Sequence, residues 1–162
     1  MTSGRLSRAR GFTLIELVVT VAIVGLLASA ALPLASMAIR RAKESDLRVA
    51  LQLIRGAIDA YQQAVAMGRV MVPPDQSGYP ADLQLLYEGV EDASSPQKVK
   101  IYFLRRLPRD PLFPDGTAAA ADTWGLRSYA SPPEDPQPGD DVFDVYSLAQ
   151  GKGLNGVAYR DW

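Results

Sequence analysis

The chain has 162 residues, 17 lysines and arginines against 18 aspartates and glutamates, and neither cysteine nor histidine. Disulfides and thiolate metal sites are therefore excluded, and catalysis is disfavoured because histidine is the commonest general base and metal ligand. From residue 110 to the end, nine acids face three bases, which offers nucleic acid no basic surface.

An apolar segment near the N-terminus is long enough to cross a membrane. From Leu17 to Ile39 there are 23 residues without a formal charge, most of them Val, Ala, Leu or Ile. About 20 such residues span the hydrocarbon core as a helix. Three arginines within the first ten residues precede it, so the positive-inside rule predicts a cytoplasmic N-terminus. A plain signal anchor fits this length better than a secretory signal, whose apolar region has about 7–15 residues.

A single carboxylate, Glu16, lies at the beginning of this apolar segment. Such a charge costs a few kcal/mol in hydrocarbon and needs a partner. One interpretation is that Glu16 stays hydrated at the depth of the lipid headgroups. The other is that cleavage after Gly11 creates an α-amino group on Phe12, which neutralises Glu16 within one chain or between adjacent chains.

The sequence GFTLIE, residues 11–16, resembles the class III signal of type IV pilins and type II secretion pseudopilins. The resemblance implies that residues 1–11 are a basic leader, removed between Gly11 and Phe12 by a prepilin peptidase. It also implies N-methylation of Phe12 and, during filament assembly, pairing of Glu16 with the terminal amine of a neighbouring subunit. Pro33 within the apolar segment predicts a helix kink.

The helical pattern continues beyond the membrane segment. Apolar residues recur at three- and four-residue steps, which marks one face of a helix: Leu47, Leu51, Ile54, Ile58 and Tyr61. Charged residues lie mostly elsewhere on the wheel, among them Arg41, Glu44, Arg48, Arg55 and Asp59. We predict one helix from about Phe12 to Met67, ended by Gly68 and the following prolines. Its first part, 12–39, would lie in the membrane or the filament core. The amphipathic part, 40–67, would pack on the chain's own domain, because no sustained heptad indicates a coiled-coil partner.

Residues 68–162 are rich in proline and glycine and contain only short candidate elements. A short helix is expected from Tyr79 through Pro80 to about Gly89, and a turn over Leu104–Pro111. The candidate strands are Val99–Leu104, Arg127–Ser131, Val142–Ser147 and Val157–Tyr159. The predicted fold is α+β and pilin-like, with the long N-terminal helix packed on a small antiparallel sheet and a loop-rich C-terminus.

Three further motifs occur in order along this domain: Gly78-Tyr79-Pro80, Leu107-Pro108-Arg109-Asp110-Pro111 and Trp124-Gly125. Together with the final Trp162, they resemble the major, or G-type, pseudopilin of type II secretion. In that family the second motif runs almost directly into the third. Here Leu112–Thr123 intervenes, and we expect it to form a loop or one helical turn.

The resemblance also implies one calcium ion in the C-terminal loops, bound by carboxylates and carbonyls. The candidate ligands are Asp140, Asp141, Asp144, Asn155 and Asp161. They match a calcium site poorly, because Lys152 lies in the same loop and calcium requires six to eight oxygens. Solvation of an exposed loop is the alternative explanation for these acids, and no cofactor is predicted.

The predicted function is structural and non-enzymatic. The chain would polymerise with itself and with minor pseudopilins into a periplasmic filament that drives protein export. Its other expected partners are the prepilin peptidase and the inner-membrane assembly platform, and it would cross the inner membrane once, with its C-terminal domain in the periplasm. A pilin or minor pilin of a type IV pilus is one alternative. A periplasmic binding or enzymatic domain on an uncleaved signal anchor is another.

Overall fold

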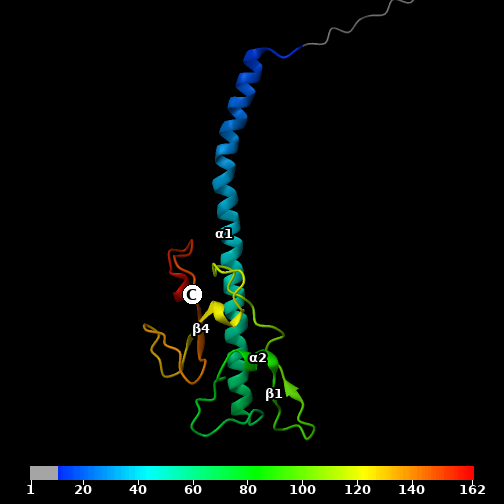
Figure 1. Cartoon of the computed structure of the whole chain (residues 1–162), viewed down its shortest axis with the longest axis vertical. Coiled ribbons are helices and arrows are strands. Elements are labelled where there is room, and N and C mark those ends of the chain that lie inside the picture. Colours follow the sequence, from blue (N-terminus) through cyan, green and yellow to red (C-terminus); the bar gives the residue numbers. More distant parts are fainter. Residues whose placement is uncertain (1–10) are drawn as a thin grey trace, which may run out of the picture. The chain divides into compact units, whose positions relative to one another are not determined.

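The computed structural model describes residues 11–162, with the side chains of 30–32 left aside, and the predicted leader up to residue 10 lies outside the described residues. The chain divides into two compact units, one ending at Arg40 and the other beginning at Arg41. The regular elements (Figure 1) are α1 Leu14–Ala66, α2 Gln84–Glu88, β1 Val90–Glu91, β2 Lys100–Ile101, β3 Trp124–Arg127 and β4 Asp144–Ser147, with 3₁₀ turns at Ala121–Thr123 and Tyr159–Asp161. The predicted α+β fold is confirmed.

In the first unit, α1 carries apolar side chains that the protein itself leaves uncovered. Every described side chain from Gly11 to Lys43 is exposed. By length and composition, α1 is apolar enough to cross a membrane, with a mean hydropathy of 2.4 over its most apolar window. Apolar surface on this scale is unfavourable in water. This part of α1 therefore requires lipid or neighbouring helices around it.

Pro33 lies inside α1, and the helix is continuous through it. Nearby hydroxyls bond to the helix itself: Ser29 donates to the Leu26 carbonyl at 2.7 Å, and Ser36 donates to the Pro33 carbonyl at 2.8 Å. Such local bonds satisfy hydroxyl groups where water is absent. The kink expected at Pro33 stays a prediction.

In the second unit, α1 forms the centre of the domain. One stripe of its side chains is buried at helical spacing: Leu47, Ala50, Leu51, Ile54, Ala57, Ile58, Tyr61 and Ala64. The rest of the core packs against this stripe and includes Leu83, Leu86, Trp124, Val142 and Val145. The amphipathic half of α1 therefore packs on the chain's own domain, as predicted.

The end of α1 follows from one glycine. Gly68 has a φ of +69°, which glycine adopts without the steric cost that other residues meet. Its N–H donates to the Val65 carbonyl, and the Arg69 N–H donates to the Ala64 carbonyl, both at 2.9 Å. This pair of bonds is a Schellman motif and satisfies carbonyls at the helix end. The end predicted at Gly68 is correct.

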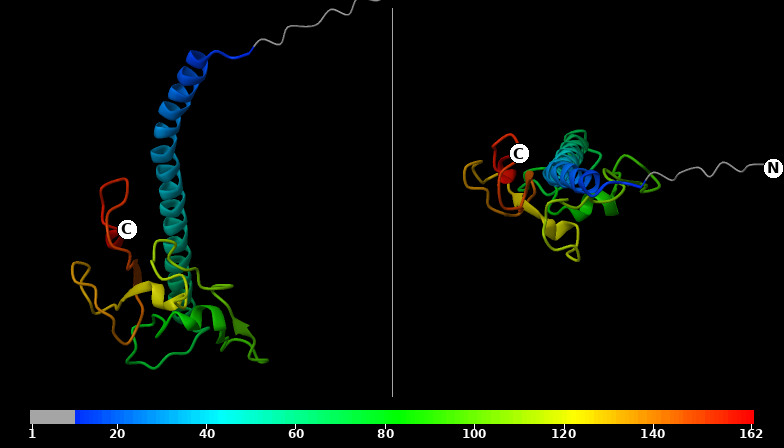
Figure 2. Two further views of the ribbon diagram at one scale, coloured as in Figure 1. Left: turned by 45° about the horizontal axis from the view of Figure 1, so that its top comes forward. Right: turned by 90° about the horizontal axis from the view of Figure 1, so that it is seen from above.

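Two small antiparallel ladders replace the single predicted sheet. β1 pairs with β2, Val90 opposite Ile101. β3 pairs with β4, from Trp124 opposite Ser147 to Arg127 opposite Asp144. Figure 2 shows the second ladder in yellow and orange, beside the green half of α1.

Several predicted elements were misplaced or too long. The strand expected at Arg127–Ser131 is wrong, because the chain turns after β3 and Ser131 N–H donates to the Ser128 carbonyl. At Val157–Tyr159 there is only one bridge, Lys152 opposite Ala158, followed by a 3₁₀ turn. The short helix α2 begins later than expected, where Asp82 accepts the N–H groups of Gln84 and Leu85. Strands of two to four residues are too short to show a reliable period.

The buried stripe of α1 can be tested with two neighbouring residues. Ile54 is fully buried and Leu53 is 53% exposed. Ile54→Ala is expected to lower the free energy of unfolding by about 2–5 kcal/mol, because it leaves a cavity in the core. Leu53→Ala should cost less than about 1 kcal/mol. Urea unfolding of the full chain in detergent measures both, and equal losses would contradict the assignment of the buried face.

Asp92 joins the turn after α1 to the β1–β2 ladder. Arg69 donates to its Oδ2 from Nε at 3.2 Å and from Nη2 at 2.5 Å, and Ser94 donates to its Oδ1 from the backbone N–H at 3.0 Å. The Arg69 hydrogen bonds, followed by those of Ser94, lower the pKa of Asp92 from 3.8 to about 2. The ionised form therefore stabilises the folded state.

Acid should remove this contribution. Because the pKa is lower in the folded chain than in the unfolded chain, the stabilisation is complete above about pH 4 and is lost as the pH falls to about 2. Asp92→Asn should thus destabilise the chain at pH 7, and its difference from wild type should shrink as the pH falls through about 2. Urea unfolding across this range measures it. Glu91→Gln is the control, since its exposed pair with Lys98 should matter little at any pH. A constant difference between Asp92→Asn and wild type would refute the linkage.

Candidate functional site

The first turn of α1 is a capping box built from Thr13 and Glu16. Glu16 N–H donates to Thr13 Oγ1 at 3.2 Å, and Thr13 N–H donates to Glu16 Oε2 at 3.0 Å. This reciprocal pair satisfies two of the N–H groups that a helix N-terminus leaves unbonded. Sequence analysis assigned Glu16 a role but missed Thr13, although the T-x-x-E spacing signals such a box.

The capping box also explains how Glu16 is accommodated in an apolar helix. Its carboxylate receives the Thr13 hydroxyl as well, at 3.0 Å, and lies where the helix dipole favours negative charge. Both bonds end on Oε2. Among the described residues, no hydrogen bond is formed to Oε1. One carboxylate oxygen is thus left for a further donor.

The surroundings of this carboxylate are apolar and uncovered. Phe12 is 87% exposed. Exposed large apolar side chains continue along the helix: Leu14, Ile15, Leu17, Val18, Val19, Val21, Ile23 and Val24. A cation that approaches Oε1 would meet a low-dielectric environment once lipid or another helix covers these residues, and the attraction would be strengthened accordingly.

The fold brings together two of the motifs found in the C-terminal domain. Trp124 is buried, and its indole Nε1 donates to the Pro108 carbonyl at 2.9 Å. The next residue, Gly125, lies opposite Tyr146, and a Cβ at Gly125 would overlap that ring. The Trp-Gly pair is therefore required by close packing.

Asp110 is the polar centre of this motif core. It is 2% exposed. Its Oδ1 accepts the Leu112 N–H at 2.7 Å, its Oδ2 accepts the Ser147 hydroxyl at 2.5 Å, and its own N–H donates to Thr123 Oγ1 at 3.1 Å. The carboxylate thus ties the loop after Pro108 to β4, and the Asp110 backbone N–H ties the same loop to Thr123, just before β3. Ser147 and Thr123 were not singled out from sequence, because they are 37 and 13 residues away from Asp110.

The inserted segment Leu112–Thr123 closes around Arg109. The Arg109 guanidinium donates to the carbonyls of Asp115 at 2.6 Å, Gly116 at 2.9 Å and Ala118 at 2.6 Å. The segment ends in the 3₁₀ turn Ala121–Thr123. A loop or one helical turn was expected; the segment is a loop that ends in a 3₁₀ turn, and the bonds from Arg109 hold the loop in place.

Removing the Asp110 carboxylate should weaken the domain strongly. Asp110→Ala leaves the Ser147 hydroxyl and the Leu112 N–H buried without their acceptor, which should cost about 3 kcal/mol of unfolding free energy. Asp122→Ala, at an exposed position in the same region, should change it by less than about 0.5 kcal/mol. Thermal and urea unfolding of the full chain provide the comparison. Similar losses of unfolding free energy in both variants would show that Asp110 does not hold the loop on β4.

Comparison with known proteins gives a match to one family model and to two similar proteins. Residues 6–32 match the family model described as the prokaryotic N-terminal methylation motif. The chain is 29% identical over 147 residues to the type II secretion system core protein G of Klebsiella pneumoniae, covering 85% of this chain and 94% of that protein. Identity to the protein of the same name from Klebsiella michiganensis is also 29%, over 136 residues, with 82% and 88% covered. No solved structure matches. The chain thus carries the methylation motif and is similar to core protein G over most of its length.

The five candidate calcium ligands are not gathered in one place. Asp141 accepts hydrogen bonds from Tyr129 N–H and the Ser77 hydroxyl. Asp144 pairs with Arg55 at 2.7 Å and with Arg127 at 3.3 Å. Asp140 and Asp141 line one cleft, Asn155 and Asp161 line a second, and Asp161 lines a third together with Asp144. Within residues 11–162, no group of three acidic side chains is placed to share a metal ion.

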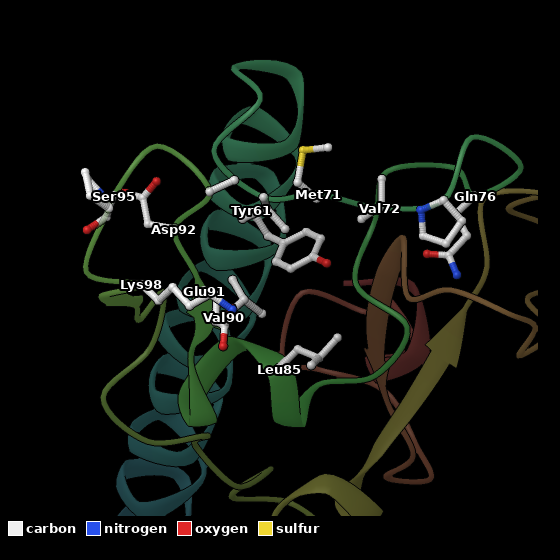
Figure 3. A pocket seen from close by; sticks show the side chains of 14 residues that line it. Tyr61, Met71, Val72, Gln76, Leu85, Val90, Glu91, Asp92, Ser95 and Lys98 are labelled. Atoms are coloured by element: carbon white, nitrogen blue, oxygen red, sulfur yellow. The ribbon is translucent and has the colours of Figure 1, made fainter.

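The C-terminal domain also has an open cleft of about 550 Å³ beside the end of α1. Figure 3 shows Tyr61 from α1, Leu85 from α2 and Val90 from β1 around it, with Asp92 and Lys98 toward its edge. The Asp92 carboxylate is held by Arg69 and Ser94. It is thus a structural group and not a poised acid or base.

Proposed function

We propose that this chain is a pseudopilin, a structural subunit that polymerises into the periplasmic filament of a type II secretion system and so drives protein export. The observation that carries the proposal is the N-terminal segment, where the methylation-motif match coincides with an uncovered apolar helix and a carboxylate in its first turn. The names of both relatives support the same machine. No observation favours a type IV pilus subunit or a signal-anchored enzyme.

Processing would come first. A prepilin peptidase would cut between Gly11 and Phe12, and Phe12 would be methylated on its new α-amino group. The apolar part of α1 would wait in the inner membrane, with the N-terminus cytoplasmic and the C-terminal domain periplasmic. The basic leader and the 23 uncharged residues from Leu17 support this topology.

Docking would then use the oxygen of Glu16 that the capping box leaves open. Thr13 holds Oε2 and orients the carboxylate, and Oε1 would accept the methylated amine of Phe12 on a neighbouring subunit. This pair would neutralise two charges that hydrocarbon penalises. Apolar helices would at the same time exchange lipid for one another.

The C-terminal domain would form the outside of the filament. The surfaces of the two units would contact further copies of the chain, minor pseudopilins and the inner-membrane assembly platform. No turnover is required of any residue, which agrees with a structural and non-enzymatic role.

The proposal is tested by mass spectrometry of the mature N-terminus together with filament recovery, in cells that carry the complete secretion machine. We expect a chain that begins at methylated Phe12. Glu16→Gln should be cleaved normally. The amount of this variant recovered in sheared filaments should be at least about tenfold lower than for wild type, because losing a charge pair of about 1.4 kcal/mol changes an equilibrium tenfold. Asp46→Asn, at an exposed position of α1, is the matched control and should assemble like wild type.

Two results would contradict the proposal. A chain that retains its first eleven residues despite an active prepilin peptidase would leave a membrane-anchored domain without a filament role. Normal filament recovery for Glu16→Gln, with cleavage intact, would refute the docking role of the carboxylate while leaving the processing in place.

A further inference from the structure

We propose that the C-terminal loop of this chain, residues 148–162, is fastened to α1 by protein side chains and folds independently of calcium. The family resemblance implies a calcium ion in these loops, and the residues present do not fit one. The inference concerns the folded subunit and does not rest on its polymerisation.

The loop is poor in oxygen donors for calcium, which takes six to eight. Asp161 is its one acidic side chain; it is exposed and lies 3.7 Å from the Arg160 guanidinium. Asn155 Oδ1 already accepts the Val157 N–H at 3.1 Å. Lys152 adds a positive charge within the same loop. A calcium ion here would meet cations where it needs carboxylates.

Several carbonyls of the loop accept hydrogen bonds from within the loop. Gly153 O accepts the Gly156 N–H at 2.9 Å, and Gly151 O accepts the Tyr159 N–H at 3.3 Å. Val157 O accepts both the Gly153 N–H at 2.8 Å and the Trp162 indole N–H at 3.3 Å. These bonds make the loop compact without a central ion.

Glu44 on α1 ties the loop from the helix side. It is 3% exposed, and its Oε1 accepts the Leu154 N–H at 3.0 Å and the Tyr159 hydroxyl at 2.9 Å. Glu44 was expected away from the apolar face. That expectation is wrong, because Glu44 lies three residues before Leu47 and so continues the buried stripe, where the loop 110 residues later covers it. Figure 1 shows this segment, in red, beside α1.

Two arginines of α1, Arg48 and Arg55, bind Trp162. Arg55 donates from Nη2 to the Trp162 carbonyl at 2.8 Å and to the Val145 carbonyl at 3.0 Å, and from Nε to Asp144 at 2.7 Å. The Arg48 guanidinium lies 4.3 Å from the centre of the Trp162 ring, a cation–π contact. Guanidinium groups thus occupy the carboxylate and carbonyls that a metal ion could otherwise have joined.

The test is the thermal unfolding of the full chain in detergent, with calcium and with the chelator EGTA. We expect the same Tm within about 1 °C in both. Glu44→Gln should lower Tm by roughly 4 °C or more in both, because a charged acceptor for two buried donors becomes neutral. It should also speed trypsin cleavage after Lys152. Glu91→Gln, an exposed carboxylate, is the control and should behave like wild type.

Two outcomes would overturn the inference. If EGTA lowered the Tm of the wild-type chain by several degrees and calcium restored it, a metal ion would be part of the fold. If Glu44→Gln matched the control in Tm and in trypsin cleavage, Glu44 would not hold the loop. The wild-type arm needs no substitution, so the calcium question is answered even if the variant fails to fold.

Discussion

The C-terminal domain depends on the apolar stripe of α1, from Leu47 to Ala64. Each of its two ladders has two strands, and each strand has two to four residues. Isolated two-stranded ladders are at best marginally stable in water. The stripe supplies the surface against which Leu86, Trp124 and Val145 are buried. The helix is therefore the structural centre of the domain, and the loops are arranged around it.

Polar side chains then determine the course of those loops. Asp110, Glu44 and Arg55 bind partners from distant parts of the chain, and Arg109 binds three carbonyls of the loop that follows it. In the described part of the chain, no buried side-chain nitrogen or oxygen lacks a hydrogen-bond partner. A chain without cysteine has no disulfides to hold such loops, and these clamps perform that task. Each combines charge with several bonds, which makes it stronger than a neutral hydrogen bond.

The two units of the chain have opposite relations to solvent. The first leaves its apolar side chains to an environment that the single chain does not contain, while the second buries its stripe within the domain. Glu16 lies near the beginning of the first unit. In the capping box with Thr13, its Oε2 caps the N-terminus of α1 and its Oε1 stays available. A helix N-terminus is a suitable place for a carboxylate in an apolar segment, because the helix dipole lowers the cost of holding a negative charge.

The long helix and the N-terminal motif were determined by the sequence itself. The helix expected from Phe12 to Met67 is found at Leu14–Ala66, since a long apolar period and the left-handed Gly68 are local signals. The insert after Pro111 and the motif residues around Asp110 were also recognisable in sequence. Their partners were not, because Ser147 meets Asp110 only after the chain has folded back. The same holds for the strand positions and for Glu44, which reads as a solvent-facing acid until Leu154 and Tyr159 cover it. Local geometry is encoded in neighbouring residues, whereas the burial of a polar group depends on which distant segment the tertiary structure places over it.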